Sequence, residues 1–236
     1  MRIVGLLLVF LFVSVQSFAE VFVAAGAGYK KPLEAVSALY EKQSGKKVLR
    51  SYGNLQQVIE QAKQSGKIDA IFGDEKFIKK SNLATKLSQL IGYGKLVLVA
   101  SKNVELKSTK DLEKMSKIAL PDSKKAIYGI AAMEFLKSAN YAESLKGKLM
   151  FVATVPQVSA YLSQGSVEVG FINLSDYLAN QKQFGVMLEI PQETYSPILI
   201  VIAPLQTSKN VELEEFMAFL DSKEAKEVFK EYGLEK

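Results

Sequence analysis

The residue types that most often perform nucleophilic and metal chemistry are missing from this sequence. It contains no Cys and no His, which excludes disulfides, thiolate or imidazole metal sites, a Ser-His-Asp triad and a histidine general base. The acids that could do acid–base work are Asp74, Glu75 and Asp176. Asp74 and Glu75 are adjacent, so they do not share one helical face; like Ser175–Asp176, they are typical of a helix start. The sequence favours binding over catalysis and predicts no catalytic residue.

Four turns are better candidates for ligand chemistry, because each follows a predicted strand and precedes a predicted helix. Free N–H groups at a helix start bind anions without any charged side chain. Asn54 and Thr154 are suited to be N-caps, and Pro156 to a first helical turn. Gly-Ala-Gly in the first turn lacks the third glycine of a dinucleotide fingerprint; the alternative is that these glycines only permit tight turns. The turns are Ala-Gly-Ala-Gly-Tyr (25–29), Ser-Tyr-Gly-Asn (51–54), Lys-Ala-Ile-Tyr-Gly (125–129) and Ala-Thr-Val-Pro-Gln (153–157).

Short apolar runs alternate with helical patterns along the whole chain, which indicates an α/β fold with mainly parallel sheets. Ligands of such sheets bind beyond the carboxyl ends of the strands, where the four turns lie. The predicted strands are Val21–Ala25, Val48–Tyr52, Ala70–Gly73, Leu96–Ala100, Lys117–Leu120, Leu149–Val152, Val169–Ile172 and Ile198–Ile202. The predicted helices are Pro32–Gln43, Leu55–Gln64, Tyr128–Ser138, Val155–Ser163 and Ser175–Gln181.

Two runs, Leu96–Ala100 and Pro197–Ala203, are the most continuously apolar of the chain, as strands buried on both faces should be. They bracket a middle segment, and one interpretation is that both cross between two lobes. That interpretation divides the chain into lobe 1, residues 20–98 with 204–236, and an inserted lobe 2, residues 99–203. The alternative is two ordinary core strands of a single sheet.

Residues 1–19 have the layout of a cleavable signal peptide. Arg2 supplies the positive charge, an apolar run extends over Ile3–Val15, and Ser17 and Ala19 occupy the −3 and −1 positions of a cleavage site. The run is short for a membrane anchor, which is the alternative. The formal charge of +5 becomes 5 − 1 = +4 without Arg2, and the lysines are spread among acids, so nucleic acid is not the expected partner.

Several segments, taken in order, resemble the periplasmic molybdate-binding proteins of ABC transporters. The resemblance extends from about Val21 to Leu234. The segments that carry it are Val21–Leu33, Ile91-Gly-Tyr-Gly-Lys-Leu-Val-Leu98, Lys117-Ile-Ala-Leu-Pro121, Ala126-Ile-Tyr-Gly-Ile-Ala-Ala-Met-Glu-Phe-Leu136, Val155-Pro-Gln157, Val169-Gly-Phe-Ile-Asn-Leu-Ser-Asp176 and a terminal helix pair over Phe219–Gly233.

The resemblance implies a two-lobed periplasmic binding protein fold with two crossover hinge strands. It also implies a tetrahedral oxyanion, molybdate or tungstate, held by neutral hydroxyls and backbone N–H groups, with no direct protein coordination of the metal and no cofactor. Carried over by position, the contacts fall at Gly28, Leu55, Tyr128, Val155 and Asn173. The family usually has serines at the positions of Gly28 and Leu55, and often Tyr at that of Asn173. The side chains that could restore donors are those of Tyr29, Asn54, Thr154 and Asn173.

The sequence therefore predicts a secreted, periplasmic solute-binding protein rather than an enzyme. It is expected to be a monomer that takes a small anionic solute and delivers it to a membrane permease of an ABC importer. Molybdate or tungstate is the first hypothesis for the solute, and another oxyanion or a small organic solute is the second. A secreted hydrolase or transferase on the same scaffold is the third, with Asp74, Glu75 or Asp176 as its only visible candidates.

Overall fold

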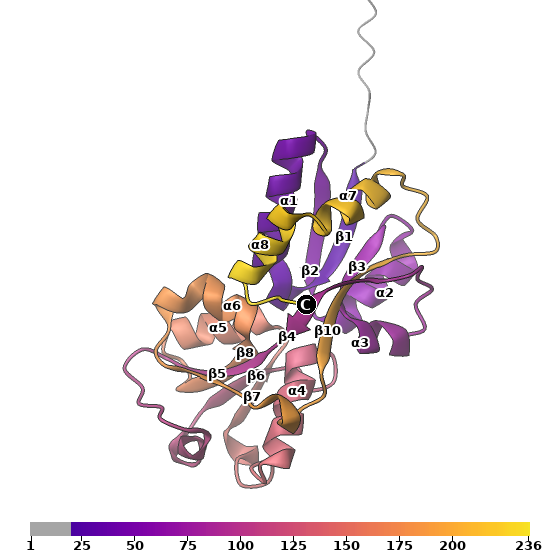
Figure 1. Cartoon of the computed structure of the whole chain (residues 1–236). Coiled ribbons are helices and arrows are strands. Elements are labelled where there is room, and N and C mark those ends of the chain that lie inside the picture. Colours follow the sequence, from indigo (N-terminus) through magenta and orange to yellow (C-terminus); the bar gives the residue numbers. More distant parts are fainter. Residues whose placement is uncertain (1–19) are drawn as a thin grey trace, which may run out of the picture.

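The computed structural model describes residues 20–236, so the predicted signal peptide, 1–19, lies outside the described residues. Two α/β lobes each surround a five-stranded sheet (Figure 1). No helix within residues 20–236 is long and apolar enough to cross a membrane. The predicted two-lobed α/β fold is confirmed.

The sheet of lobe 1 has the order β2-β1-β3-β10-β4. The first three strands are parallel, and β10 is antiparallel to both β3 and β4. Their bounds are β1 Val21–Gly26, β2 Val48–Gly53, β3 Ala70–Asp74, β4 Gln89–Gly94 and β10 Ile198–Pro204.

The sheet of lobe 2 has the order β7-β6-β8-β5-β9. Here β6 is parallel to β7 and β8, and β5 is antiparallel to β8 and β9. Their bounds are β5 Leu96–Ala100, β6 Ile118–Pro121, β7 Leu149–Val152, β8 Val169–Asn173 and β9 Met187–Glu189.

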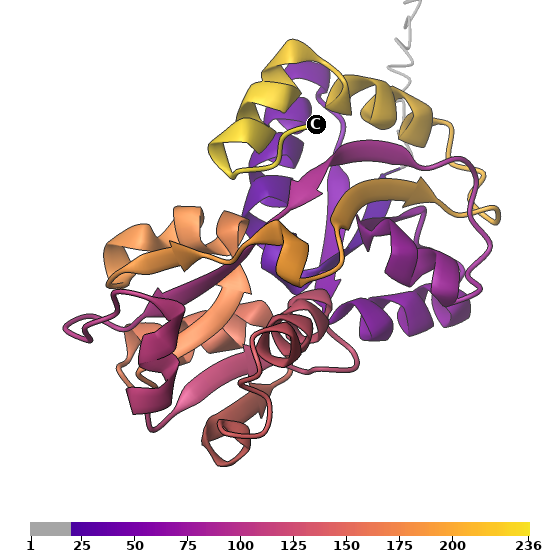
Figure 2. The same cartoon turned by 60° about the horizontal axis from the view of Figure 1, so that its bottom comes forward.

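The two apolar runs are buried strands, as predicted, and each adjoins a point where the chain passes from one lobe to the other. All of β5 belongs to the sheet of lobe 2 and all of β10 to that of lobe 1, so the alternative of one shared sheet is wrong. The chain changes sheets at Lys95, between β4 and β5, and within residues 190–197, between β9 and β10. Figure 2 shows the two lobes joined in this way. The predicted boundaries, 98/99 and 203/204, fall inside β5 and β10. The division of the chain at these positions stays a prediction.

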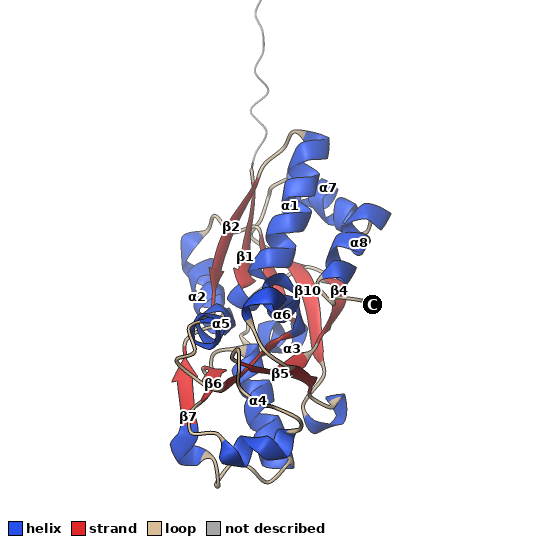
Figure 3. Ribbon diagram, turned by 90° about the vertical axis from the view of Figure 1, so that its left-hand side faces the viewer, coloured by secondary structure: helices blue, strands red, loops and turns tan. Residues whose placement is uncertain are grey.

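Helices cover both faces of the lobe 1 sheet, and α4, α5 and α6 pack on that of lobe 2 (Figure 3). The predicted helix over Ser175–Gln181 begins earlier, because Asn173 is its N-cap. The predicted terminal pair over Phe219–Gly233 is present but begins earlier, at Glu212. Ser222 separates its two helices and starts the second by accepting a bond from the Ala225 N–H at 3.1 Å. The helices are α1 Lys30–Ser44, α2 Leu55–Ser65, α3 Glu75–Lys80, α4 Ile127–Ser138, α5 Val155–Ser163, α6 Leu174–Asn180, α7 Glu212–Leu220 and α8 Lys223–Glu231.

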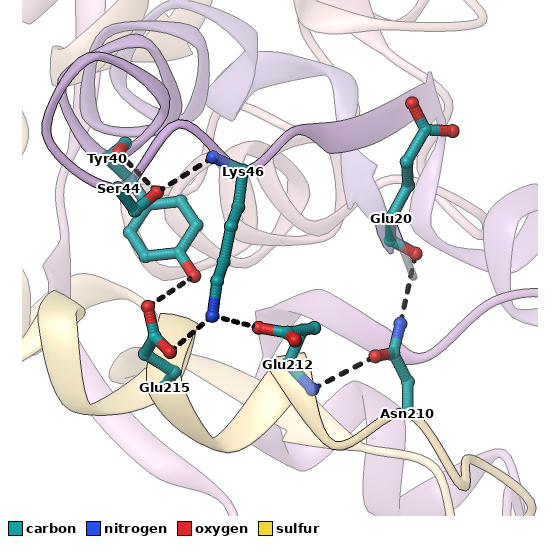
Figure 4. A network of polar contacts seen from close by, with 7 residues as sticks. All are labelled: Glu20, Tyr40, Ser44, Lys46, Asn210, Glu212 and Glu215. Atoms are coloured by element: carbon teal, nitrogen blue, oxygen red, sulfur yellow. Dashed lines mark hydrogen bonds and ion pairs between the residues drawn. The ribbon is translucent and has the colours of Figure 1, made fainter. Parts of the chain in front are cut away.

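A polar network fastens the C-terminal helices to the start of lobe 1 (Figure 4). The Lys46 ammonium, just beyond the end of α1, bonds the carboxylates of Glu212 and Glu215 on α7. Asn210 donates to the Glu20 carbonyl at 2.9 Å, so the segment that leads into α7 is bonded to the first described residue. These bonds therefore hold α7 against the N-terminal part of lobe 1.

Candidate functional site

A small cavity lies between the lobes, where several helices begin. We call it the interlobe cavity. Its volume is about 30 Å³, which has room for about two water molecules. A tetrahedral oxyanion has five heavy atoms, so binding one requires the walls to move apart slightly. The cavity is lined by Gly26, Ala27, Gly28, Tyr29, Gly53, Asn54, Leu55, Ala126, Ile127, Tyr128, Thr154 and Val155.

The four turns singled out in the sequence meet at this cavity. Lobe 1 supplies the turns that lead into α1 and α2, and lobe 2 those that lead into α4 and α5. The N–H groups of a first helical turn have no partner within the helix, and the helix dipole is positive there. No Lys, Arg, Asp or Glu lines the cavity. The favourable environment for an anion therefore comes from the backbone dipoles rather than from charged side chains.

Seven of the eight predicted site residues line the interlobe cavity, all except Asn173. Their role as ligand contacts stays a prediction. Asn54 is the N-cap of α2, as predicted: its side-chain oxygen accepts the Gln57 N–H at 2.9 Å. That bond uses the oxygen, so the amide NH₂ is the part of Asn54 suited to an anion. Thr154 is the N-cap residue of α5 but makes no capping bond with its side chain, which leaves its hydroxyl available for a ligand.

Leu55 and Val155 contribute backbone rather than side-chain chemistry. Leu55 is the first residue of α2 and is buried; a Cβ on Gly73 would lie 2.7 Å from its Cδ1, so the side chain packs on β3. Val155 is the first residue of α5 and is likewise buried. Both can offer an N–H to a ligand, and neither offers a side-chain donor.

Tyr29 and Tyr128 join the two lobes inside the protein. Tyr29 precedes α1 in lobe 1, Tyr128 lies in the first turn of α4 in lobe 2, and their hydroxyls are hydrogen-bonded to each other. Burial raises the pKa of both phenols, so both remain neutral donors at physiological pH. The bond occupies one of the two hydroxyl protons. It is a contact between lobes that the sequence does not predict.

Gly94, at the end of β4, makes room for this tyrosine pair. A Cβ at this position would lie 2.2 Å from the Tyr128 hydroxyl and 2.7 Å from that of Tyr29. The motif Gly-Tyr-Gly-Lys contains this glycine, but only the folded structure shows what approaches it.

Asn173 is fully buried beside the cavity and forms a hydrogen bond with the opposite lobe. Its side-chain NH₂ donates to the Gly28 carbonyl at 2.9 Å. Its side-chain oxygen has no hydrogen-bond partner within residues 20–236. A Cβ at Gly28 would lie 2.8 Å from that oxygen, so the Asn173 amide takes space that any larger residue at position 28 would need.

The acids proposed as catalytic candidates have structural partners. Asp74 is the N-cap of α3 and accepts the Phe77 N–H at 2.7 Å, and Glu75 pairs with Lys79 at 2.8 Å. The Asp176 carboxylate accepts the Ser159 hydroxyl. Burial raises the pKa of Asp74 and of Asp176. Within residues 20–236, no three acidic residues come together as a metal site requires.

The chain is similar to known binding proteins over most of its length. It is 27% identical over 227 residues to a molybdate-binding protein of Rhodobacter capsulatus, covering 91% of this chain and 87% of that protein. It is 28% identical over 220 residues to a putative ABC transporter substrate-binding lipoprotein of Bacillus subtilis, covering 89% and 84%. The structure of the Azotobacter vinelandii periplasmic molybdate-binding protein superposes with a TM-score of 0.84 at 22% identity, covering 92% of this chain and 99% of that one.

A family model matches nearly the entire part of the chain that the structure describes. The match covers residues 21–235 and includes both sheets and all the turns at the interlobe cavity. The chain therefore belongs to the bacterial extracellular solute-binding proteins.

Proposed function

We propose that this protein is the periplasmic solute-binding component of an ABC importer and binds a molybdate- or tungstate-type oxyanion in the interlobe cavity. The observation that carries the proposal is the meeting of four helix starts from two lobes at one neutral cavity. Such a site binds an anion through backbone dipoles, without a titratable partner. The relatives named for molybdate support the choice of solute.

Binding is coupled to closure of the lobes. A solute that accepts N–H bonds from α1 and α2 on one side and from α4 and α5 on the other favours the closed arrangement over the open one. The Tyr29–Tyr128 bond and the bond from Asn173 to Gly28 also join the two lobes, so they add to this preference. A membrane permease that recognises the closed surface then receives loaded protein. We propose a monomer, exported by a signal peptide at residues 1–19, as the acting form.

The test is thermal unfolding and calorimetric titration of residues 20–236 with molybdate, tungstate, sulfate and phosphate. A solute present at one hundred times its Kd adds about 2.7 kcal/mol to the free energy of unfolding, a rise in Tm of roughly 5–10 °C. Molybdate or tungstate is expected to produce this rise, and Thr154→Ala to reduce it. Absence of any shift at millimolar oxyanion contradicts the choice of solute.

A second candidate is a protein with the same transport role but a different solute, either another oxyanion or a small organic molecule. The observation that favours it is the lack of hydroxyls at three of the positions carried over from the family. Gly28 has no side chain, Leu55 is turned into the core, and Asn173 is bonded to the opposite lobe. Each lost donor to a buried anion costs about 1–3 kcal/mol. A stabilising solute other than molybdate or tungstate in the same titration supports this candidate.

A further inference from the structure

A second and larger cavity lies between the lobes, beside residues 190–197, where the chain returns from lobe 2 to lobe 1. Its volume is about 460 Å³, within the range of small-molecule sites. Lobe 1 contributes α2 and α3, lobe 2 contributes α4, and residues 196–198 connect them; Figure 2 shows these helices facing each other. We call it the lysine groove. Its lining residues are Gln56, Ile59, Glu60, Lys63, Asp74, Lys76, Phe77, Lys80, Ser81, Lys124, Ile127, Ile130, Ala131, Glu134, Ser196, Pro197 and Ile198.

The groove combines an apolar wall with cations. Ile59 and Phe77 come from lobe 1, Ile127 and Ile130 from lobe 2, and Ile198 from the start of β10. An apolar body placed among them would contact both lobes at once. Such a wall favours a ligand with hydrophobic surface.

Each carboxylate of the groove already has a bond. Glu60 pairs with Lys63 at 2.9 Å, and Asp74 caps α3. Glu134 accepts the Ser196 N–H at 2.7 Å and the Ser196 hydroxyl at 3.2 Å.

Two of the remaining lysines have no ion pair in the described part of the chain. The Lys76 ammonium lies 3.5 Å from the Ser196 hydroxyl and interacts electrostatically with the Asp74 carboxylate. Lys80 and Lys124 line the groove, and within residues 20–236 neither has an ion pair or a side-chain hydrogen bond. The groove therefore offers ammonium groups that lack counter-charges, next to an apolar wall.

We propose that the lysine groove binds an organic anion with an apolar body and a single carboxylate, and that this site is distinct from the interlobe cavity. The body lies on the isoleucine and phenylalanine wall, and the carboxylate is held by the free lysines, chiefly Lys80 and Lys124. Because the ligand contacts α3 and α4 together, it also favours the closed arrangement of the lobes.

The test uses phenylbutyrate as the probe, with phenylbutanol and phenylbutylamine as its uncharged and cationic analogues. The chain has no Trp, so Phe77→Trp places the protein's single tryptophan in the groove wall, where its fluorescence can be excited selectively. A saturable fluorescence change with phenylbutyrate, and weaker binding of both analogues, is the expected result. Calorimetry on the unsubstituted protein checks that the reporter did not create the site.

Charge variants locate the carboxylate. The double variant Lys80→Gln with Lys124→Gln is expected to weaken the binding of phenylbutyrate about tenfold. The control is Lys67→Gln with Lys137→Gln, exposed lysines outside the groove, and it should leave the affinity unchanged.

Equal binding of the alcohol, no saturation at millimolar probe, or equal weakening by both pairs overturns the proposal. So does displacement of phenylbutyrate by molybdate together with weakening by Thr154→Ala, since the probe then occupies the interlobe cavity. An oxyanion that fails to bind leaves this result unaffected.

Discussion

At the scale of single residues, Gly28 and Asn173 act as one unit. They are 145 positions apart in sequence, yet the Asn173 amide bonds the Gly28 carbonyl and fills the space in front of its Cα. The smallest residue on one lobe therefore accommodates the Asn173 amide of the other lobe. A larger residue at position 28 should create a clash.

Gly28→Ser alone is expected to lower the free energy of unfolding by about 1–3 kcal/mol, because its Cβ would lie 2.8 Å from the Asn173 oxygen. In an Asn173→Ala background the same serine should cost less, since the blocking amide is gone. Chemical denaturation of the four proteins in this double-mutant cycle measures the difference. An identical cost of the serine in both backgrounds would show that the two positions are independent.

At the scale of elements, the sequence predicted what is encoded locally. The turns into α1, α2, α4 and α5 were found because caps and glycines are local signals, and Asn54 behaves as its type predicts. The strand β4 was missed as a separate element, because its Gly-Tyr-Gly pattern is not typical of a strand. It forms against β10 and the chain end, where the Tyr93 N–H donates to the Glu235 carbonyl at 2.9 Å. The three-residue β9 was missed for a similar reason: it exists only as a partner of β5.

The end of β4 gives a prediction at this scale. Gly94→Ala is expected to cost about 1–3 kcal/mol of stability, because the new methyl group would displace both tyrosine hydroxyls. Tyr128→Phe in the same chain removes the nearer oxygen and should recover part of the loss. Gly147→Ala is the matched control: no atom lies within 4 Å of its added Cβ, so its effect should stay within about 0.5 kcal/mol. Thermal unfolding of the four proteins decides; equal effects of the two alanines would contradict the role given to Gly94.

At the scale of the whole molecule, the interlobe cavity and the polar network that holds α7 on lobe 1 lie far apart. The α1 helix starts at the interlobe cavity and has 15 residues, so its far end lies about 22 Å away. Lys46 follows that end and bonds Glu212 and Glu215 of α7 (Figure 4). Changes in this network should alter stability without altering the solute site.

The network predicts a specific dependence of stability on pH. Hydrogen bonding to Lys46 lowers the pKa of Glu215 from its ordinary value of 4.5. A lowered folded-state pKa stabilises the protein above that ordinary value, and the contribution is lost as the pH falls through the lowered pKa. Glu215→Gln should therefore be less stable than the unsubstituted protein at pH 7. The difference in the free energy of unfolding should shrink below pH 4.5 and in high salt.

The control is Glu214→Gln, on the same helix but without an ion pair within residues 20–236. It should show no such pH-dependent gap in urea denaturation. A gap that persists unchanged at low pH would mean that Glu215 acts through packing rather than charge. Oxyanion affinity at pH 7 should be the same in all three proteins, because α7 reaches neither cavity.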